Sequence, residues 1–215
     1  MLPIGTQERE AAALCYRASM LAPEPAPPLY KFGDGMPEDR PCTYQNVWTV
    51  EELSGTKRLV IAPKSGTLNI LERLVELMPE PFWLLYVLVV PRGEGGAGRY
   101  QSSEPRTREQ VRRFLQEFQA FLETDGRQNL WVRSGSSSAT LINDRHGLIY
   151  GYGLLQDWEE ILKQIGLIEV PSASIKIPDP HSHHYHDHAS FDAEASRLLA
   201  YLEWHHTPLR DQDLR

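Results

Sequence analysis

The stretch that most constrains the fold of this chain is the apolar run FWLLYVLVV at residues 82–90. A membrane-spanning helix needs about 20 apolar residues, so this shorter run predicts a buried β-strand. The segment RLVIA at 58–62 predicts an earlier strand. Apolar residues at helical spacing over 65–78 predict a helix between the two strands, with Ser65 as its N-cap. This order with short joints predicts a right-handed βαβ crossover.

The middle of the chain adds a helix and a meander. Thr107 and Gln110 form a capping box ahead of an apolar stripe at helical spacing, and Gly126 is placed to end that helix. The segments NLWVRS, ATLIN and GLIYGYG predict three strands joined by turns at GSSS and NDRHG. We therefore expect an α/β (α+β) sandwich: a mixed β-sheet with a βαβ unit and a three-strand antiparallel meander, with helices packed on the sheet.

Shorter patterns predict the remaining elements. Thr49 and Glu52 in TVEEL make a capping box, which predicts a short helix at 49–53. The glycine-rich segment PRGEGGAGRY has the composition of a loop. DWEEILKQIG predicts a helix that ends at its glycine, and LIEV and SIKI predict the last strands. A further apolar stripe predicts a final helix over 191–206.

Length and proline content indicate how the chain is divided. A chain of 215 residues with 41% apolar and 24% charged residues is ordinary for one globular domain. Residues 22–41 are rich in proline, which fixes the backbone and removes hydrogen-bond donors, so they predict an extended arm. We expect residues 1–43 to form an N-terminal helix and this arm. Residues 44–215 then form a single α/β domain, which includes a histidine-rich connector at 179–190 and a C-terminal helix.

Charge and cysteine content limit the classes of partner. The 22 basic and 29 acidic residues leave a net charge of −7, which repels phosphate backbones, so we expect no nucleic-acid partner. An acidic surface favours a basic protein partner instead. No apolar run is long enough for a membrane partner. Cys15 and Cys42 lack a disulfide-scaffold or CxxC spacing, which indicates a reducing compartment and predicts a cytoplasmic protein.

The most unusual local chemistry is the stretch DPHSHHYHDHASFD at 179–192. Neutral imidazole binds zinc and nickel, so a cluster of histidines predicts a divalent-metal site. In an extended segment, side-chain alternation places the first two histidines on one side and the other three on the opposite side. In a helical segment, His184 and His188 are paired. The five candidate ligands are His181, His183, His184, His186 and His188.

The same stretch also fits a polar connector between a strand and a helix. Pro178 and Pro180 end the strand, and Ser190 suits the N-cap of the next helix. His205 and His206 suit the last turn of that helix, far from the cluster. Three carboxylates are placed to join a metal site, namely Asp179, Asp187 and Asp192.

Two other places carry candidate sites. Lys64, Ser65 and Thr67 come at the start of the helix after the first core strand, where free backbone N–H groups predict an anion site. Asp144 and His146 in NDRHG are a candidate acid–base pair, because a carboxylate and an imidazole can exchange a proton. That composition is also typical of a hairpin turn, and the turn interpretation is favoured.

No coherent catalytic constellation emerges from these motifs. The favoured hypothesis is therefore a non-catalytic binding or protein-interaction domain with an acidic surface. The alternative hypothesis is a metal-binding protein or metal-dependent enzyme centred on the cluster from His181 to His188.

Overall fold

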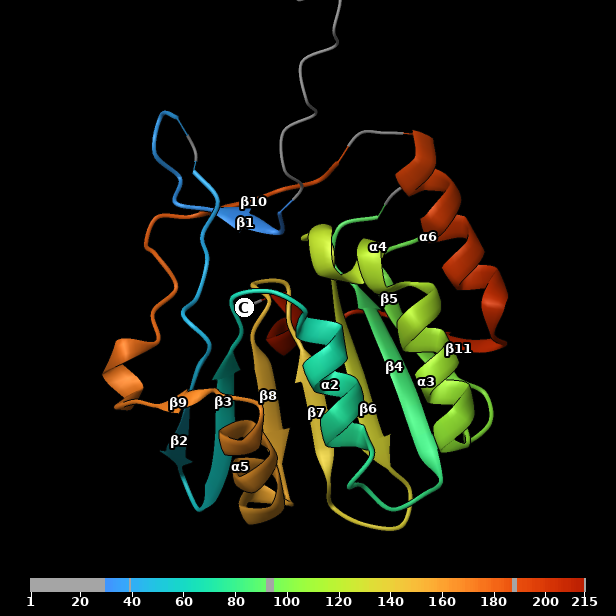
Figure 1. The fold of residues 1–215 in the computed structure, drawn as a ribbon. Coiled ribbons are helices and arrows are strands. Elements are labelled where there is room, and N and C mark those ends of the chain that lie inside the picture. Colours follow the sequence, from blue (N-terminus) through green and yellow to red (C-terminus); the bar gives the residue numbers. More distant parts are fainter. Residues whose placement is uncertain (1–29, 39, 92–94, 187–188, 215) are drawn as a thin grey trace, which may run out of the picture.

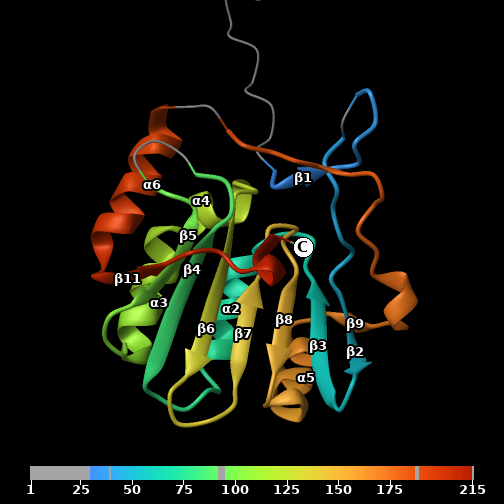
Figure 2. The ribbon, with the colours of Figure 1, turned by 180° about the vertical axis from the view of Figure 1, so that it is seen from behind.

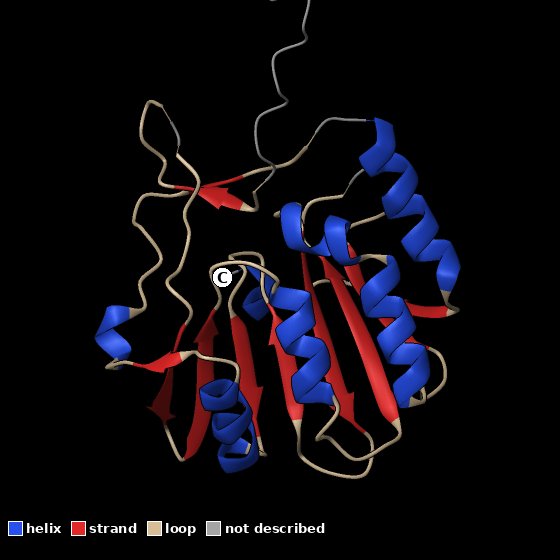
Figure 3. Ribbon diagram, viewed as in Figure 1, coloured by secondary structure: helices blue, strands red, loops and turns tan. Residues whose placement is uncertain are grey.

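The computed structural model describes residues 30–38, 40–91, 95–186 and 189–214. Its centre is a nine-stranded mixed β-sheet (Figure 1). Five helices pack on this sheet, so the expected α/β sandwich is confirmed (Figure 3). From edge to edge the strands are β11 (Trp204–Thr207), β5 (Gly98–Ser102), β4 (Phe82–Leu88), β6 (Gln128–Ser134), β7 (Thr140–Asn143), β8 (Ile149–Tyr152), β3 (Thr56–Ala62), β2 (Val47–Leu53) and β9 (Ile168–Glu169).

The helices leave one face of the sheet largely open. Figure 1 shows α2, α3 and α5 in front of the strands, and Figure 2 shows the strands in front from the opposite side. The covered face carries the main core, which includes Trp48, Leu71, Phe114 and Trp158. No helix within the described residues is long and apolar enough to cross a membrane. The helices are α2 (Thr67–Val75), α3 (Arg108–Glu117), α4 (Gln119–Thr124), α5 (Leu155–Gln164) and α6 (Ala189–Tyr201), with short 3₁₀ turns η1 (Ser172–Ser174) and η2 (Asp211–Leu214).

The predicted βαβ unit is formed by β3, α2 and β4. Helix α2 crosses the covered face of the sheet and buries Leu68, Leu71 and Leu74. Four antiparallel pairings connect β3 to β4 through β8, β7 and β6, so β3 and β4 run parallel. Figure 1 shows that the crossover is right-handed. The three strands between them, β6, β7 and β8, are the predicted antiparallel meander.

Helix ends follow the capping rules only in part. The capping box is confirmed: the backbone N–H of Gln110 donates to the Thr107 hydroxyl, and that of Thr107 donates to the Gln110 side chain. At α2, Gly66 takes the N-cap position in a left-handed conformation in place of Ser65. Gly126 is not left-handed, so its role differs from the predicted one. A Cβ at Gly126 would lie 2.3 Å from the carbonyl oxygen of Lys31, so close backbone packing requires glycine there.

The helix predicted at 49–53 is wrong, because this segment lies in β2. Every residue of β2 pairs with β3, and Thr49 lies opposite Val60. Trp48 and Val50 pack in the main core, so the side chains alternate with a period of two. Sheet pairing and burial thus override the local capping pattern.

The C-terminal helix is shorter than predicted, since α6 ends at Tyr201 and β11 follows. His205 and His206 therefore lie on an edge strand and not in the last turn of a helix. Strand β11 pairs with β5, whose first three residues lie in the segment that the sequence assigned to a loop. The pairing of two short polar strands is a tertiary contact, which local composition does not report.

The last two predicted strands are reduced to one. The segment LIEV contributes only β9, which pairs parallel with β2. The segment SIKI forms no strand, because its first residue ends η1 and the rest has no ladder pairing. The prediction for SIKI is therefore wrong, although Ile175 and Ile177 still pack against the small core around Val60.

A separate two-stranded sheet lies beyond one end of the main sheet (Figure 1). It pairs β1 (Phe32–Gly33) with β10 (Ser182–His183), and we call it the β1–β10 pair. Phe32 is only 2% exposed, so the arm is anchored at this point. The N-terminal helix, predicted from Gln7 to about Met20, lies outside the described residues. The β1–β10 pair holds the histidine segment near the turn between β7 and β8.

Candidate metal centre

The histidine segment is extended where it forms β10, so its side chains alternate. His181 and His183 fall on one side, with ring centroids 5.0 Å apart. His184 and His186 form a second group, with ring centroids 6.4 Å apart. This is the arrangement expected for an extended segment. His188 lies outside the described residues.

His146 joins His181 and His183 to make a group of three, which we call the histidine triad. It lies in the turn between β7 and β8 and is 8% exposed. One ligand atom from each of the three side chains lies within 4.8 Å of the other two. Zinc sites with an open position use three protein ligands, so the triad has a suitable number of imidazoles.

Asp144 organises the turn that presents His146. Its Oδ1 accepts hydrogen bonds from the backbone N–H groups of His146 at 2.9 Å and Leu148 at 2.8 Å. Gly147 has a φ of 75°, a left-handed conformation that glycine adopts without strain. NDRHG therefore forms the predicted hairpin turn and also supplies a member of the histidine triad.

Two ring nitrogens face each other across the triad. Nδ1 of His146 lies 2.8 Å from Oδ2 of Asp144, and Nδ1 of His181 lies 2.9 Å from the carbonyl oxygen of Pro178. Both oxygens only accept, so each Nδ1 carries the proton and each neutral ring has its lone pair on Nε2. These two Nε2 atoms are 3.2 Å apart. Two facing lone pairs repel unless a proton or a cation lies between them.

His183 supplies the third imidazole. Burial, followed by the positive charge of Arg145, lowers the pKa of His183 to about 3, so the ring is neutral at physiological pH. Arg145 Nε donates to His183 Nε2 at 2.8 Å. Nδ1 of His183 is buried and has no hydrogen-bond partner within the described residues. Arg145 is thus the hydrogen-bond partner of Nε2 of His183, whereas Nδ1 has none among the described residues.

Lys31 is a buried cation near the triad. It is 5% exposed, and its Nζ donates to the carbonyl oxygen of Asp144 at 2.8 Å. Burial lowers the pKa of Lys31 to about 8, although the nearby carboxylates of Asp144, Glu123 and Asp125 act in the opposite direction. The turn beneath the triad is therefore fixed from both sides, by its own carboxylate and by this lysine.

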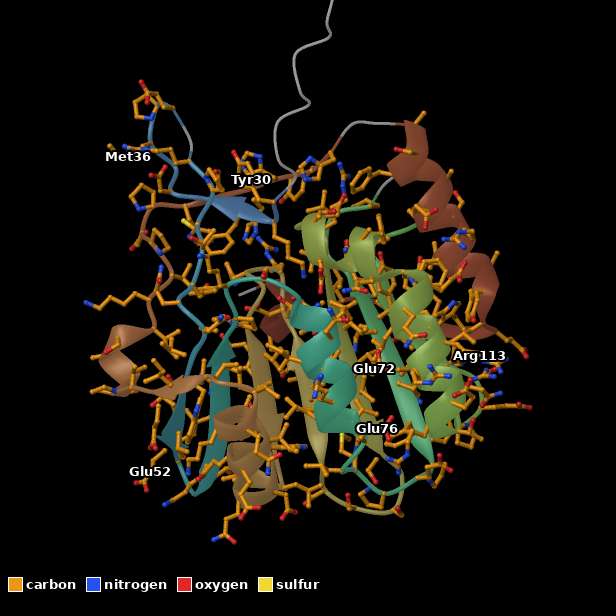
Figure 4. The ribbon with its side chains drawn as sticks, viewed as in Figure 1. Tyr30, Met36, Glu52, Glu72, Glu76 and Arg113 are labelled. Atoms are coloured by element: carbon orange, nitrogen blue, oxygen red, sulfur yellow. The ribbon has the colours of Figure 1, made fainter. Side chains whose placement is uncertain are left out.

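His184 and His186, the described histidines of the segment outside the triad, contact other parts of the chain. His184 packs on Tyr30, with ring centroids 4.1 Å apart, at the start of β1 (Figure 4). His186 Nε2 donates to the carbonyl oxygens of Tyr30 at 3.2 Å and Thr124 at 3.0 Å. Within the described residues, the only group of metal-ligating side chains is the histidine triad. The predicted ligands and carboxylates outside it are His184, His186, Asp179 and Asp192, whereas His188 and Asp187 lie outside the described residues.

The predicted anion site of Lys64, Ser65 and Thr67 contains a carboxylate of the protein itself. The backbone N–H of Leu68, at the start of α2, donates to Oε1 of Glu123 at 2.7 Å. A negative side chain therefore already complements the positive end of this helix. The residues around the cavity of about 250 Å³ at this point include Lys31, Lys64, Ser65, Thr67, Glu123 and His146.

His146 is the member of the triad that the sequence did not assign to a metal site. It is 35 residues from His181 in the chain and belongs to a turn motif. An aspartate two residues before a histidine was the available signal, because a carboxylate often orients a ligating imidazole. The contact itself depends on the β1–β10 pair, which the sequence did not predict.

Comparison of the chain with protein-family models, with curated proteins and with solved structures finds no match.

Proposed function

We propose that this chain binds one divalent transition-metal ion, with zinc as the reference ion, through His146, His181 and His183. The observation that carries the proposal is the pair of facing Nε2 atoms, 3.2 Å apart, in rings whose Nδ1 protons are already committed. Two nitrogens bound to one tetrahedral zinc ion at 2.0–2.1 Å lie roughly 3.3 Å apart. The pair therefore already has the separation that a shared metal requires.

The hydrogen bonds around the triad also suit a metal. Ligating histidines usually donate their other N–H to a carboxylate or a backbone carbonyl, which fixes the ring and makes its free nitrogen a better ligand. Asp144 does this for His146, and the carbonyl of Pro178 does it for His181. The carboxylate is thus a positioning residue and not a ligand.

The third ligand has to approach the other two. The three ligand atoms lie within 4.8 Å of one another, so His183 moves by roughly 1.5 Å to reach tetrahedral spacing. Arg145 has to leave Nε2 of His183 as this happens, because a protonated or metal-bound ring nitrogen does not accept its hydrogen bond. Three imidazoles leave a fourth position open for water or another ligand.

Cobalt absorption tests the proposal directly, because four-coordinate Co²⁺ gives a strong visible spectrum. The unmodified chain, prepared without nickel affinity, is titrated with Co²⁺ and then with Zn²⁺. We expect a four-coordinate spectrum that saturates at one ion per chain and disappears when Zn²⁺ is added. His146→Ala removes the spectrum, and Asp144→Asn weakens Co²⁺ binding about 10- to 100-fold by releasing the His146 ring.

His205→Ala is the matched control, because this exposed residue lies on β11, on the far edge of the sheet. The control variant retains the spectrum of the unmodified chain. Absorption that survives His146→Ala, or that is lost equally in the control, would sink the proposal.

A further inference from the structure

The open face of the sheet carries an aromatic surface. Cross-strand pairing places Leu85, Trp131, Ile142 and Tyr150 in one row across β4, β6, β7 and β8. All four side chains are half-buried, although none of the α-helices in the described part of the chain covers this face (Figure 2). These four strands therefore present an apolar floor beside the turn that carries His146.

The C-terminal segment roofs one end of this floor. It crosses the open face from β11 to η2, as Figure 2 shows. Asp213 pairs with Arg99 of β5, and both side chains are almost completely buried. Asp213 also accepts a hydrogen bond from the backbone N–H of Arg210 at 2.7 Å. These contacts form one wall of an open cavity of about 470 Å³ between η2, the floor and the turn.

The size and lining of this cavity suit a small ligand with a planar ring. Ligand sites are commonly 300–1,000 Å³, largely apolar, with a few placed polar groups. Trp131, Tyr150 and Tyr152 line the cavity, together with Ile142 and Ile177. Aromatic faces of this kind bind planar rings by stacking.

Among the charged groups around the cavity, Arg145 is the one placed to bind an anionic group. Asp144 and Asp213 also line it, but donors already satisfy their carboxylate oxygens. Arg145 uses only its Nε, toward His183, so its terminal nitrogens have no partner within the described residues. Arg58 lies over the Tyr150 ring at 4.4 Å and pairs with Glu51. The guanidinium of Arg145 thus offers donors to an anionic group, although the nearby charge of Asp144 also acts on it.

We propose that this cavity binds a small anion that carries a planar ring, with the ring against Trp131 and the anionic group at Arg145. Nucleoside monophosphates and aromatic carboxylates share this chemistry. The cavity shares Arg145 and His146 with the metal centre, but its ligand does not require the metal.

Calorimetric titration in buffer that contains EDTA tests this inference separately from the metal. The probes are adenosine 5′-monophosphate, benzoate, adenosine and inorganic phosphate. We expect one of the two ring-bearing anions to bind at least about tenfold more tightly than adenosine or phosphate. Which of the two binds identifies the source of the anion. Failure of both, or equal binding of ring-free phosphate, overturns the inference.

Variants locate the binding site. Trp131→Ala and Arg145→Gln each weaken binding of the ring-bearing anion about tenfold or more, whereas Trp131→Phe, which keeps a ring, retains most of it. The matched control is Arg113→Gln, because Arg113 points outward from α3 in the opposite layer (Figure 4). Unchanged binding in Arg145→Gln, or an equal loss in Arg113→Gln, contradicts the inference even if Trp131→Ala fails to fold. Neither result bears on the proposed zinc binding, because these titrations are made in EDTA.

Discussion

At the scale of single residues, hydrogen bonds assign the protons of the triad. The carboxylate of Asp144 and the carbonyl of Pro178 hold the Nδ1 protons of His146 and His181, and this leaves two bare nitrogens face to face. A shared proton relieves this arrangement if one ring becomes charged, and a metal ion relieves it with both rings neutral. These two possibilities can be told apart by pH. A metal ion displaces protons from its ligands, so the affinity for the metal falls as the pH is lowered.

Arg145 opposes the metal through both its charge and its hydrogen bond. Its Nε holds Nε2 of His183 at 2.8 Å, and its positive charge lies beside the triad. We expect Arg145→Gln to tighten Zn²⁺ binding about fivefold, on the order of 1 kcal/mol. Competition with a chromophoric chelator measures the change, and Arg113→Gln serves as the control. Weaker Zn²⁺ binding in Arg145→Gln would show that the arginine supports the site.

Lys31 makes the stability depend on pH in the alkaline range. Its pKa is about 8 in the folded chain and 10.5 when unperturbed, so between these values the unfolded chain holds a proton that the folded chain has lost. The free energy of unfolding therefore rises as the pH increases from about 8 to about 10.5, by on the order of 3 kcal/mol. Lys31→Met removes this rise. Urea unfolding of both proteins near the two ends of the range measures it, and parallel pH profiles would refute the assignment.

At the scale of elements, the sequence predicted those whose patterns are local. The strands at 58–62 and 82–90, the helix between them and the capping box at Thr107 follow from periodicity and side-chain hydrogen bonds. Local patterns did not predict the strand at 49–53 or the strand β11, because pairing with β3 and with β5 decides their conformation. The candidate metal site is divided in the same way. His181 and His183 follow from alternation, whereas His146 depends on a contact between elements far apart in the chain.

Gly126 connects the β1–β10 pair to the rest of the fold. Its N–H donates to the carbonyl of His184 at 3.0 Å, and the His184 N–H donates to the carbonyl of Lys31 at 2.8 Å. Gly126→Ala places a methyl group 2.3 Å from that Lys31 oxygen, so the β1–β10 pair has to shift. We expect Zn²⁺ affinity to fall at least about tenfold while the circular dichroism of the sheet is retained.

Gly55→Ala is the control for this change, because a Cβ at Gly55 meets no atom within 4 Å, although its φ of 82° adds local strain. Equal Zn²⁺ affinity in Gly126→Ala and the unmodified chain would show that the β1–β10 pair does not set the geometry of the triad.

At the scale of the whole molecule, the proposed ion connects segments that are distant in sequence. His146 belongs to the main sheet, whereas His181 and His183 belong to the segment that pairs with the arm. A ligand that binds only the folded state stabilises it by about 2.7 kcal/mol at one hundred times its Kd. For a domain of this length we expect Zn²⁺ to raise the Tm by roughly 5–10 °C. Differential scanning calorimetry with Zn²⁺ or with EDTA measures the shift, and its persistence in His183→Ala would contradict the assignment.

The expectation of a basic protein partner stays a prediction, as does the expectation of a cytoplasmic protein. Both rest on the net charge and cysteine content of the chain. Purification from the native host at physiological salt tests the first, and we expect a basic protein to co-purify in fixed ratio. Recovery of the chain alone, under conditions that preserve other complexes, counts against it.

Equilibrium Zn²⁺ titration, in competition with a chromophoric chelator, tests the central claim most directly when unmodified, His146→Ala and His184→Ala chains are compared. The geometry predicts one ion per unmodified chain, an unchanged affinity in His184→Ala, and a loss of at least about tenfold in His146→Ala. An affinity that His146→Ala leaves unchanged, or that falls with His184→Ala instead, would contradict a metal centre built on His146, His181 and His183.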